Sequence, residues 1–459
     1  MKNTYLPIFI FLFFISSRSF AQTIKNDPKL EFKNGRMSVL LDDGNIKFTP
    51  GGRFTMDAAY LKEDITPLGS GSRVKEARIN MALKVKKFSY FFEIDFERSE
   101  IRMKDLTARY NFTDHNFIKV GHYTEPFSPN YLTTTKKVSF IGRPNMASAF
   151  APSRALGISF RHYQKRFWFE GGIFGENVNQ KYNGDDGYAL TGRLVGIPVE
   201  MPGSHLHFGF SASYRLANNR GLDDDGSSYY NRKINYTAGL QNYIDQQIFL
   251  ASYVGPSGSD SYGQNDLEDL RNGGAKNQLK FDFEIMDIYK NFNWQVEFIT
   301  TRVNRVMNKA KILEFERDGG LYPETWEDIK WKYGEPRSLN FYGYNIKASW
   351  LIFGGQYKYS KYSSTLSQIT NRALEFSLRY SYTNLNDTEG DFINGKFYTK
   401  EGKNLSMTGG ETGAFSAALN YIINANLRIV GDYTFQMIDN YSAPDEDIHI
   451  IQARVQAMF

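Results

Sequence analysis

The most constraining feature of this sequence is an alternation of apolar and polar residues that recurs along nearly the whole chain. Residues 90–97 read YFFEIDFE, so Tyr90, Phe92 and Ile94 share one face and Glu93 and Asp95 the other. A period of two is typical of β-strands, and runs of about 9–11 residues suit a tilted strand that crosses a bilayer. The same pattern recurs in residues 77–85, 206–215, 279–285, 292–298, 342–350, 374–382, 415–421 and 427–435.

A soluble β-sandwich would also alternate, but two further features favour a membrane barrel. The chain has 37 Phe, 30 Tyr and 5 Trp although its mean hydropathy is −0.47. A membrane barrel explains this combination, because aromatic residues form girdles on its outer face while the residues that face the lumen are polar. Short connections such as residues 113–116 alternate with long ones such as 303–339. We therefore predict an all-β fold, a transmembrane antiparallel β-barrel of about 16 strands with short periplasmic turns and long outer loops. The register is least clear in residues 227–254.

The ends of the chain predict where the protein resides. Residues 1–21 combine a lysine, an apolar run and small residues before Ala21, which is the pattern of a signal peptide. We expect an N-terminal extension at 22–44, too short for a folded plug, and the barrel at 45–459. The closing run 449–459 alternates and ends in Phe459, which resembles the sorting signal of outer-membrane proteins. The signal peptide and the terminal strand together predict the outer membrane of a bacterium, and the lack of cysteine excludes a disulfide-stapled fold.

The connection after the fifth predicted strand, residues 124–154, is strongly basic. It contains Lys136, Lys137, Arg143 and Arg154 against the single acid Glu125. If this loop folds inward, its cations lie where a pore is narrowest, and rings of Arg or Lys are typical of anion-passing pores. Two other roles stay open for these cations: binding of lipopolysaccharide, or pairing with wall carboxylates, for which the candidates are Glu93, Asp95 and Asp105.

Several motifs in order carry a family resemblance. They are Gly51-Gly52-Arg53, Glu76-Ala77-Arg78, Val120-Gly121-His122 with Glu125-Pro126-Phe127, Phe140-Ile141-Gly142-Arg143, Phe150 to Arg154 with Leu156-Gly157, Ala373 to Tyr382, Leu385-Asn386, Leu419-Asn420-Tyr421 and Gln452 to Phe459. With these motifs the chain resembles the phosphate-selective porin O and P family from near Asn45 to Phe459.

The resemblance implies a homotrimer of 16-stranded barrels with an arginine-lined constriction. Arg53 matches an arginine of the family, Lys136 or Lys137 and Arg143 match basic positions of the third outer loop, and Asp105 matches a wall carboxylate. Arg78, Arg154 and Lys75 complete the pore-lining candidates. Where phosphate-specific members carry two adjacent arginines, this chain has Lys75-Glu76, with Lys75 facing outward unless a bulge turns it. This difference favours a broader anion or nutrient pore.

The predicted function is therefore passive diffusion of small solutes with a preference for anions such as phosphate. A surface-binding barrel or an outer-membrane hydrolase is the alternative, because long loops serve binding as well. The six histidines form no H-E-x-x-H motif, and no G-x-S-x-G is present. We expect no catalytic residue, cofactor, metal ion or nucleic-acid partner; lipid, lipopolysaccharide and small anions are the expected partners.

Overall fold

The structure is a computed structural model. It describes residues 28–459 except 34, 98–99, 180–186, 218–233, 255–273, 307–311, 314–315, 318–324, 326, 329–336, 394–395, 399–405 and 442. The predicted signal peptide lies outside the described residues.

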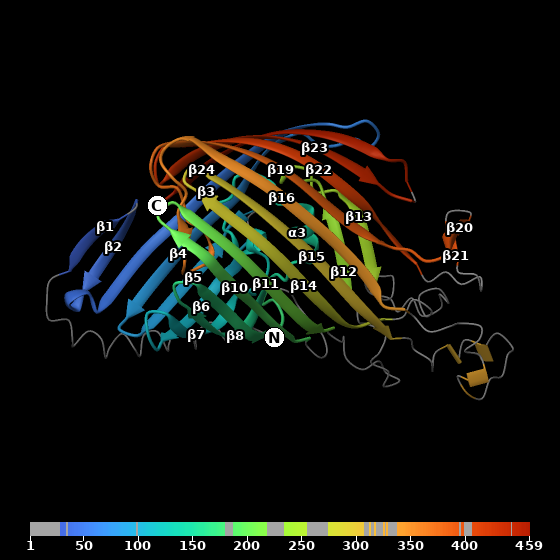
Figure 1. The fold of residues 1–459 in the computed structure, drawn as a ribbon, viewed down its shortest axis with the longest axis horizontal. Coiled ribbons are helices and arrows are strands. Elements are labelled where there is room, and N and C mark those ends of the chain that lie inside the picture. Colours follow the sequence, from blue (N-terminus) through green and yellow to red (C-terminus); the bar gives the residue numbers. More distant parts are fainter. Residues whose placement is uncertain are drawn as a thin grey trace.

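The described chain forms a closed antiparallel β-barrel (Figure 1). Its main sheet has 18 strands, of which β1 and β2 form an appended hairpin, so that 16 remain in the wall. The barrel closes where β24 pairs with β3 from His449↔Lys62 to Met458↔Arg53. The wall strands are β3 (Ile46–Lys62), β4 (Gly71–Val85), β5 (Phe88–Asp95), β6 (Arg102–Asn111), β7 (Asn116–Thr124), β8 (Arg154–Tyr163), β9 (Phe167–Phe174), β10 (Ala189–Met201), β11 (Ser204–Leu216), β14 (Gly274–Tyr289), β15 (Phe292–Val306), β16 (Leu339–Phe353), β19 (Ala373–Asp387), β22 (Met407–Ile422), β23 (Leu427–Asp439) and β24 (Glu446–Met458). The predicted barrel with 16 strands is confirmed.

The two faces of the wall follow the alternation in the sequence. Along β23 buried and exposed residues alternate, with Thr434 and Gln436 facing inward and Ile429 and Tyr433 outward. Lumen-facing polar groups are paired inside, while exposed apolar side chains form the lipid-facing belt. No helix in the described ranges is long and apolar enough to cross a membrane. The belt includes Phe54, Met56, Ile79, Leu156, Ile158, Leu190, Phe208, Phe283, Ile346, Trp350, Leu378, Phe415, Leu419, Ile451 and Val455.

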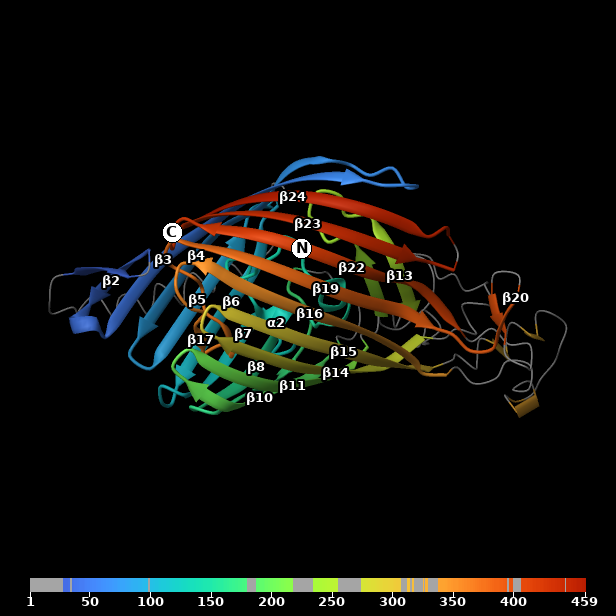
Figure 2. The same cartoon turned by 45° about the horizontal axis from the view of Figure 1, so that its top comes forward.

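Two hairpins extend the barrel at its opposite ends (Figures 1 and 2). At the periplasmic end, β1 (Lys29–Lys33) pairs with β2 (Arg36–Leu41), and β2 pairs with the start of β3 after the short 3-10 helix η1 (Asp42–Gly44). At the outer end, β20 (Asp391–Ile393) pairs with β21 (Lys396–Tyr398).

A hairpin from the long loop after β11 fills part of the lumen from the outer side. It consists of β12 (Ile234–Gly239) and β13 (Ile248–Val254), and its apolar residues pack against inward-facing residues of the wall. Leu250 and Phe341 of the wall strand β16 are both fully buried in this core. Each such side chain contributes about 1.5–3 kcal/mol on burial, so the insert is firmly packed. Residues 234–254 therefore add a lumenal hairpin and no wall strand.

One periplasmic connection departs from the otherwise short turns. Residues 354–372, between β16 and β19, contain the two-residue strands β17 (Tyr359–Ser360) and β18 (Thr365–Leu366) and fold into the lumen. Arg193 Nη2 of β10 donates to the carbonyl of Ser364 (2.9 Å), and Trp168 Nε1 of β9 donates to that of Tyr362 (3.1 Å). The lumen is thus narrowed from both ends.

Candidate functional site

The third outer loop, residues 125–153, crosses the lumen and contacts the opposite wall. It contains two short helices, α2 (Pro129–Leu132) and α3 (Asn145–Phe150). The hydroxyl of Ser128 caps the N-terminus of α2. The Ile141 amide donates to Asp432 Oδ2 on β23 (2.6 Å), and Asn420 on β22 donates to the Ser139 carbonyl (2.6 Å). Because this loop begins at β7 and ends at β8, these contacts show that it spans the pore. The loop is an inward-folded constriction.

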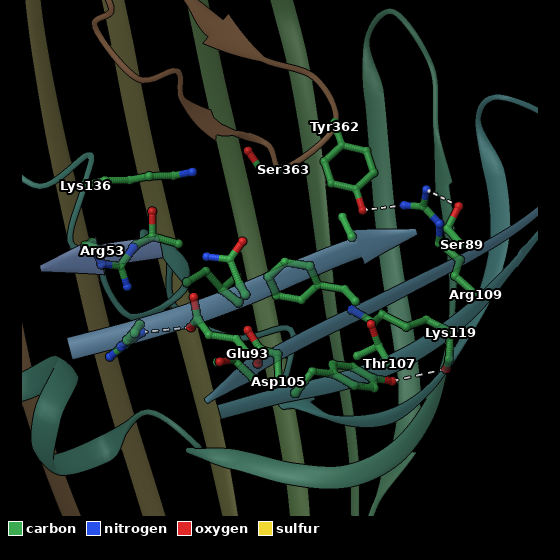
Figure 3. A pocket seen from close by; sticks show the side chains of 18 of the residues that line it. Arg53, Ser89, Glu93, Asp105, Thr107, Arg109, Lys119, Lys136, Tyr362 and Ser363 are labelled. Carbon is green, nitrogen blue, oxygen red and sulfur yellow. Dashed lines mark hydrogen bonds and ion pairs between the residues drawn. The ribbon is translucent and has the colours of Figure 1, made fainter. Parts of the chain in front are cut away.

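Between this loop, strands β3 to β9 and the 354–372 segment lies a cavity of about 680 Å³. Figure 3 shows Arg53, Glu93, Asp105 and Lys136 around it, with Tyr362 and Ser363 entering from the other segment. Eleven basic residues line the cavity against four acids, Glu76, Glu93, Asp105 and Glu170. The basic ones are Arg36, Lys47, Arg53, Arg78, Lys84, Arg109, Lys119, Lys136, Arg143, Arg154 and Arg161.

Wall carboxylates hold three of the predicted pore-lining arginines. Arg53 Nε lies 2.6 Å from Glu76 Oε2, and Arg78 Nη2 lies 2.8 Å from Glu76 Oε1. Arg78 also reaches Asp95 Oδ2 (2.8 Å) and Glu93 Oε1 (3.0 Å). These bonds fix the guanidinium groups in place and offset much of their charge.

Arg154 is held in the same way, because its Nε lies 2.9 Å from Asp105 Oδ1 on β6. Its guanidinium is only partly buried, so the pair faces the cavity. Pairing with wall carboxylates therefore accounts for Arg53, Arg78 and Arg154.

The two remaining loop cations of the cavity are different. Among the described residues, neither Lys136 nor Arg143 has a carboxylate within 4 Å. Arg143 Nη2 donates to the Thr133 carbonyl (3.1 Å), and its guanidinium carbon lies 4.9 Å from the centre of the Tyr131 ring. Burial, together with the nearby cations Arg36 and Arg53, lowers the pKa of Lys136 to about 8. These side chains thus present positive charge that the wall does not neutralise.

Comparison with known proteins decides the family. The family model of phosphate-selective porin O and P matches residues 48–459. The chain belongs to the phosphate-selective porin O and P family. It is an outer-membrane porin, as its motifs predict.

A solved outer-membrane structure shares the porin's fold at very low sequence identity. The loop L8 deletion mutant of OmpT from Vibrio cholerae matches with a TM-score of 0.50 and 8% identity, covering 90% of this chain and 99% of that one. The anion-selective porin from Comamonas acidovorans matches with a TM-score of 0.48 and 10% identity, covering 90% and 100%. An uncharacterized protein of Caulobacter vibrioides is 28% identical over 153 residues, which are 31% of this chain and 30% of that protein.

Two predicted pore residues of the porin lie away from the cavity. Lys75 is the extra residue of a β-bulge in β4, where Thr55 pairs with Glu76 and Met56 with Val74. The bulge turns Lys75 inward, and its Nζ lies 3.5 Å from the centre of the Tyr243 ring on the lumenal hairpin connection. Lys137 faces two much smaller pockets beside the loop, and burial lowers its pKa.

Arg109 on β6 is a cavity cation that the sequence analysis did not single out. Its Nη1 donates to the Tyr362 hydroxyl (2.6 Å) and its Nη2 to Ser89 Oγ (3.3 Å), and no described carboxylate lies within 4 Å. Alternation from Asp105 places residue 109 on the inward face, so a signal was present. Its partner Tyr362 comes from 253 residues further along the chain, and no pattern predicts that contact.

A second cluster of charges lies at the far side of the cavity. Lys119 Nζ lies 2.8 Å from Glu170 Oε1, and Arg161 Nε lies 2.7 Å from Glu170 Oε2. The sequence analysis did not name this cluster either. Both cations of this cluster have a carboxylate partner, so their positive charge is offset in the same way as that of Arg78.

Proposed function

We propose that this porin allows passive diffusion of small solutes across the outer membrane with a preference for anions, and that it has no enzymatic activity. The observation that carries the proposal is the lining of the cavity, where eleven basic residues face four acids. The loop and the 354–372 segment narrow the lumen at this cavity, so a solute that crosses the barrel there meets these charges.

The paired and unpaired cations have different roles in this proposal. Arg53, Arg78 and Arg154 are held by carboxylates and form a rigid wall. Lys136, Arg143 and Arg109 keep positive charge without a described carboxylate partner, and they supply the attraction for a passing anion. Charge-assisted hydrogen bonds from such groups replace part of the water that an anion loses on entry. Inside a narrow lumen with low-dielectric walls, the same charges exclude cations more strongly than they would in bulk water.

Glu76 supports a broader anion pore over a phosphate-specific one. The family resemblance implies that phosphate-specific members carry an arginine here, whereas Glu76 pairs with and neutralises Arg53 and Arg78. The positive charge of these two wall cations is thereby largely offset. Attraction then depends on a few dispersed cations, which suits anions in general better than one tightly dehydrated ion.

The remaining predictions on export and assembly are also proposals. Residues 1–21 act as a signal peptide and 22–44 as an extension before the barrel domain. The porin assembles as a homotrimer and contacts lipopolysaccharide, and family membership supports the trimer. Crosslinking in native outer membranes, followed by mass determination, tests this assembly; a monomer would overturn it.

The experiment that tests the function is a charge reversal within the loop. Lys136, Lys137 and Arg143 are replaced together by glutamate, and the zero-current potential is measured across a planar bilayer in a KCl gradient. We expect the ion preference to shift toward potassium. The control replaces Lys62, Arg73 and Lys87, which are exposed and outside the cavity, and should keep the preference of the wild type. Equal potentials for both triple variants would mean that the loop does not line the conducting path, and absence of channels in the wild type would favour a binding barrel or a hydrolase.

A further inference from the structure

Tyr362 lies at one side of the cavity, and neighbouring side chains contact its hydroxyl and its ring. Tyr362 is 46% exposed although it projects from the inward-folded 354–372 segment. Its hydroxyl accepts the bond from Arg109, and its ring stacks on Phe117 with centroids 6.1 Å apart and planes 23° apart. The Arg161 guanidinium carbon also lies 4.9 Å from the ring centre. A ring held in this way, in a residue that is nearly half exposed and lines the cavity, can serve as a platform for a solute.

The cavity is also rich in hydroxyl groups. Nine of its lining residues are Ser or Thr, among them Thr133, Thr134 and Thr135 of the third loop and Ser363 and Thr365 of the opposite segment. A hydroxyl both donates and accepts hydrogen bonds. A bare inorganic anion uses mainly the donor, whereas a solute with hydroxyls of its own uses both.

The unneutralised cations lie beside this platform. Figure 3 shows the Lys136 side chain extending toward the part of the cavity where Ser363 and Tyr362 lie. Arg109 contacts Tyr362 directly, and Arg143 lies over the ring of Tyr131. Positive charge, hydroxyls and a partly exposed tyrosine therefore border the same space.

The size of that space favours a ring-containing solute. Its volume of about 680 Å³ falls in the range of pockets that enclose organic ligands, roughly 300–1,000 Å³. A single inorganic anion would contact few of the groups that line it.

From these observations we propose that the preferred solutes are acidic sugars, namely small saccharides that carry a phosphate or a carboxylate. The inference rests on the proposed anion preference and deepens it. The anionic group pairs with Lys136, Arg143 or Arg109, the sugar hydroxyls bond with the Ser and Thr side chains, and the apolar face of the sugar ring packs on Tyr362. Such binding has to stay weak enough for the solute to leave again.

The test measures how added solutes block the ion current of single channels in KCl. The probes are glucose 6-phosphate and glucuronate, with inorganic phosphate and glucose for comparison. We expect each acidic sugar to block with a dissociation constant on the order of tenfold below that of phosphate, the size of one aromatic contact plus added hydrogen bonds. Block by only one acidic sugar would identify phosphate or carboxylate as the anionic group. Equal constants for phosphate and both sugars, or block by glucose as strong as by the acidic sugars, would overturn the proposal.

Variants at Tyr362 separate ring packing from general charge. Tyr362→Leu should weaken the block by acidic sugars on the order of fivefold to tenfold, whereas Tyr362→Phe, which keeps the ring, should retain most of it. Tyr441→Leu is the matched control, because Tyr441 is 44% exposed but lies in the connection between β23 and β24, outside the cavity. An unchanged block in Tyr362→Leu would overturn the role of the ring.

The zero-current potential of the same channels keeps the two proposals apart. A channel that prefers anions but binds no acidic sugar refutes only the inference on solutes. A channel that prefers cations refutes the proposed function as well.

Discussion

Glu76 on β4 accepts a hydrogen bond from the hydroxyl of Thr135, 2.9 Å from its Oε2, and so ties the barrel wall to the loop that crosses the lumen. The same carboxylate pairs with Arg53 and Arg78. One buried acid therefore helps to hold the loop in position and also offsets the charge of two wall arginines.

Replacing Glu76 by glutamine should lower the stability of the barrel and raise its preference for anions. Arg53 would lose its carboxylate partner in a buried site, which costs about 3 kcal/mol in the free energy of unfolding. The freed guanidinium would at the same time raise the preference for anions. Urea unfolding in detergent and the zero-current potential measure the two effects. Glu100→Gln, which removes an exposed ion pair with Arg102 outside the cavity, should change neither. Unchanged selectivity in Glu76→Gln would show that Arg53 does not face the path.

The preference for anions should weaken as the pH rises through 8. A lysine is charged below its pKa, so with a pKa of about 8 the Lys136 ammonium is about nine-tenths charged at pH 7 and about one-tenth at pH 9. The zero-current potential in KCl should therefore move toward zero between these values. The zero-current potential of the Lys136→Arg variant should stay constant over this pH range, because arginine keeps its charge. A wild-type potential that does not change with pH would contradict the placement of Lys136 at the conducting path.

Shortening the 354–372 segment should widen the pore. The segment occupies the lumen near the periplasmic end, where Tyr357 N bonds to the Lys290 carbonyl (2.9 Å). A two-residue turn in its place should raise the single-channel conductance. Shortening residues 63–70, the connection between β3 and β4 that does not line the cavity, is the control and should leave conductance unchanged. An unaltered conductance after removal of 354–372 would place the narrowest point elsewhere.

Truncating a buried side chain between the lumenal hairpin and the wall should destabilise the packing of the hairpin. Leu250→Ala removes a fully buried side chain between the hairpin and the wall, with an expected loss of about 2–5 kcal/mol in the free energy of unfolding. Limited proteolysis of the folded protein detects release of the hairpin. Leu378→Ala, on the lipid-facing side and 52% exposed, should leave cleavage of the hairpin unchanged. Equal protection in both variants would indicate that the hairpin is held by its polar contacts.

The sequence predicts features that depend on a local pattern, such as the strands and their faces, but not features that depend on a local irregularity or on contacts between distant segments. Strand positions are encoded in the alternation, so the predicted run at 77–85 lies within β4, and the inward position of Arg78 follows from the same pattern. The side to which Lys75 points depends on one bulge, which the alternation cannot reveal.

Charge pairing between strands depends on register, which the sequence did not provide. It offered both partners, Arg154 and Asp105, but not their pairing across the lumen wall. The 354–372 segment has no periodic pattern, and it enters the pore because buried donors such as Arg193 bond to its carbonyls. The contact of Tyr362 with Arg109 follows from that entry alone.

The zero-current potential of the wild-type channel in a KCl gradient at pH 7 tests the central claim most directly. Net positive charge at the constriction predicts that chloride crosses more readily than potassium, which gives the potential the sign of an anion-selective pore. A potential of the opposite sign would show that the paired carboxylates, and not the free cations, govern passage.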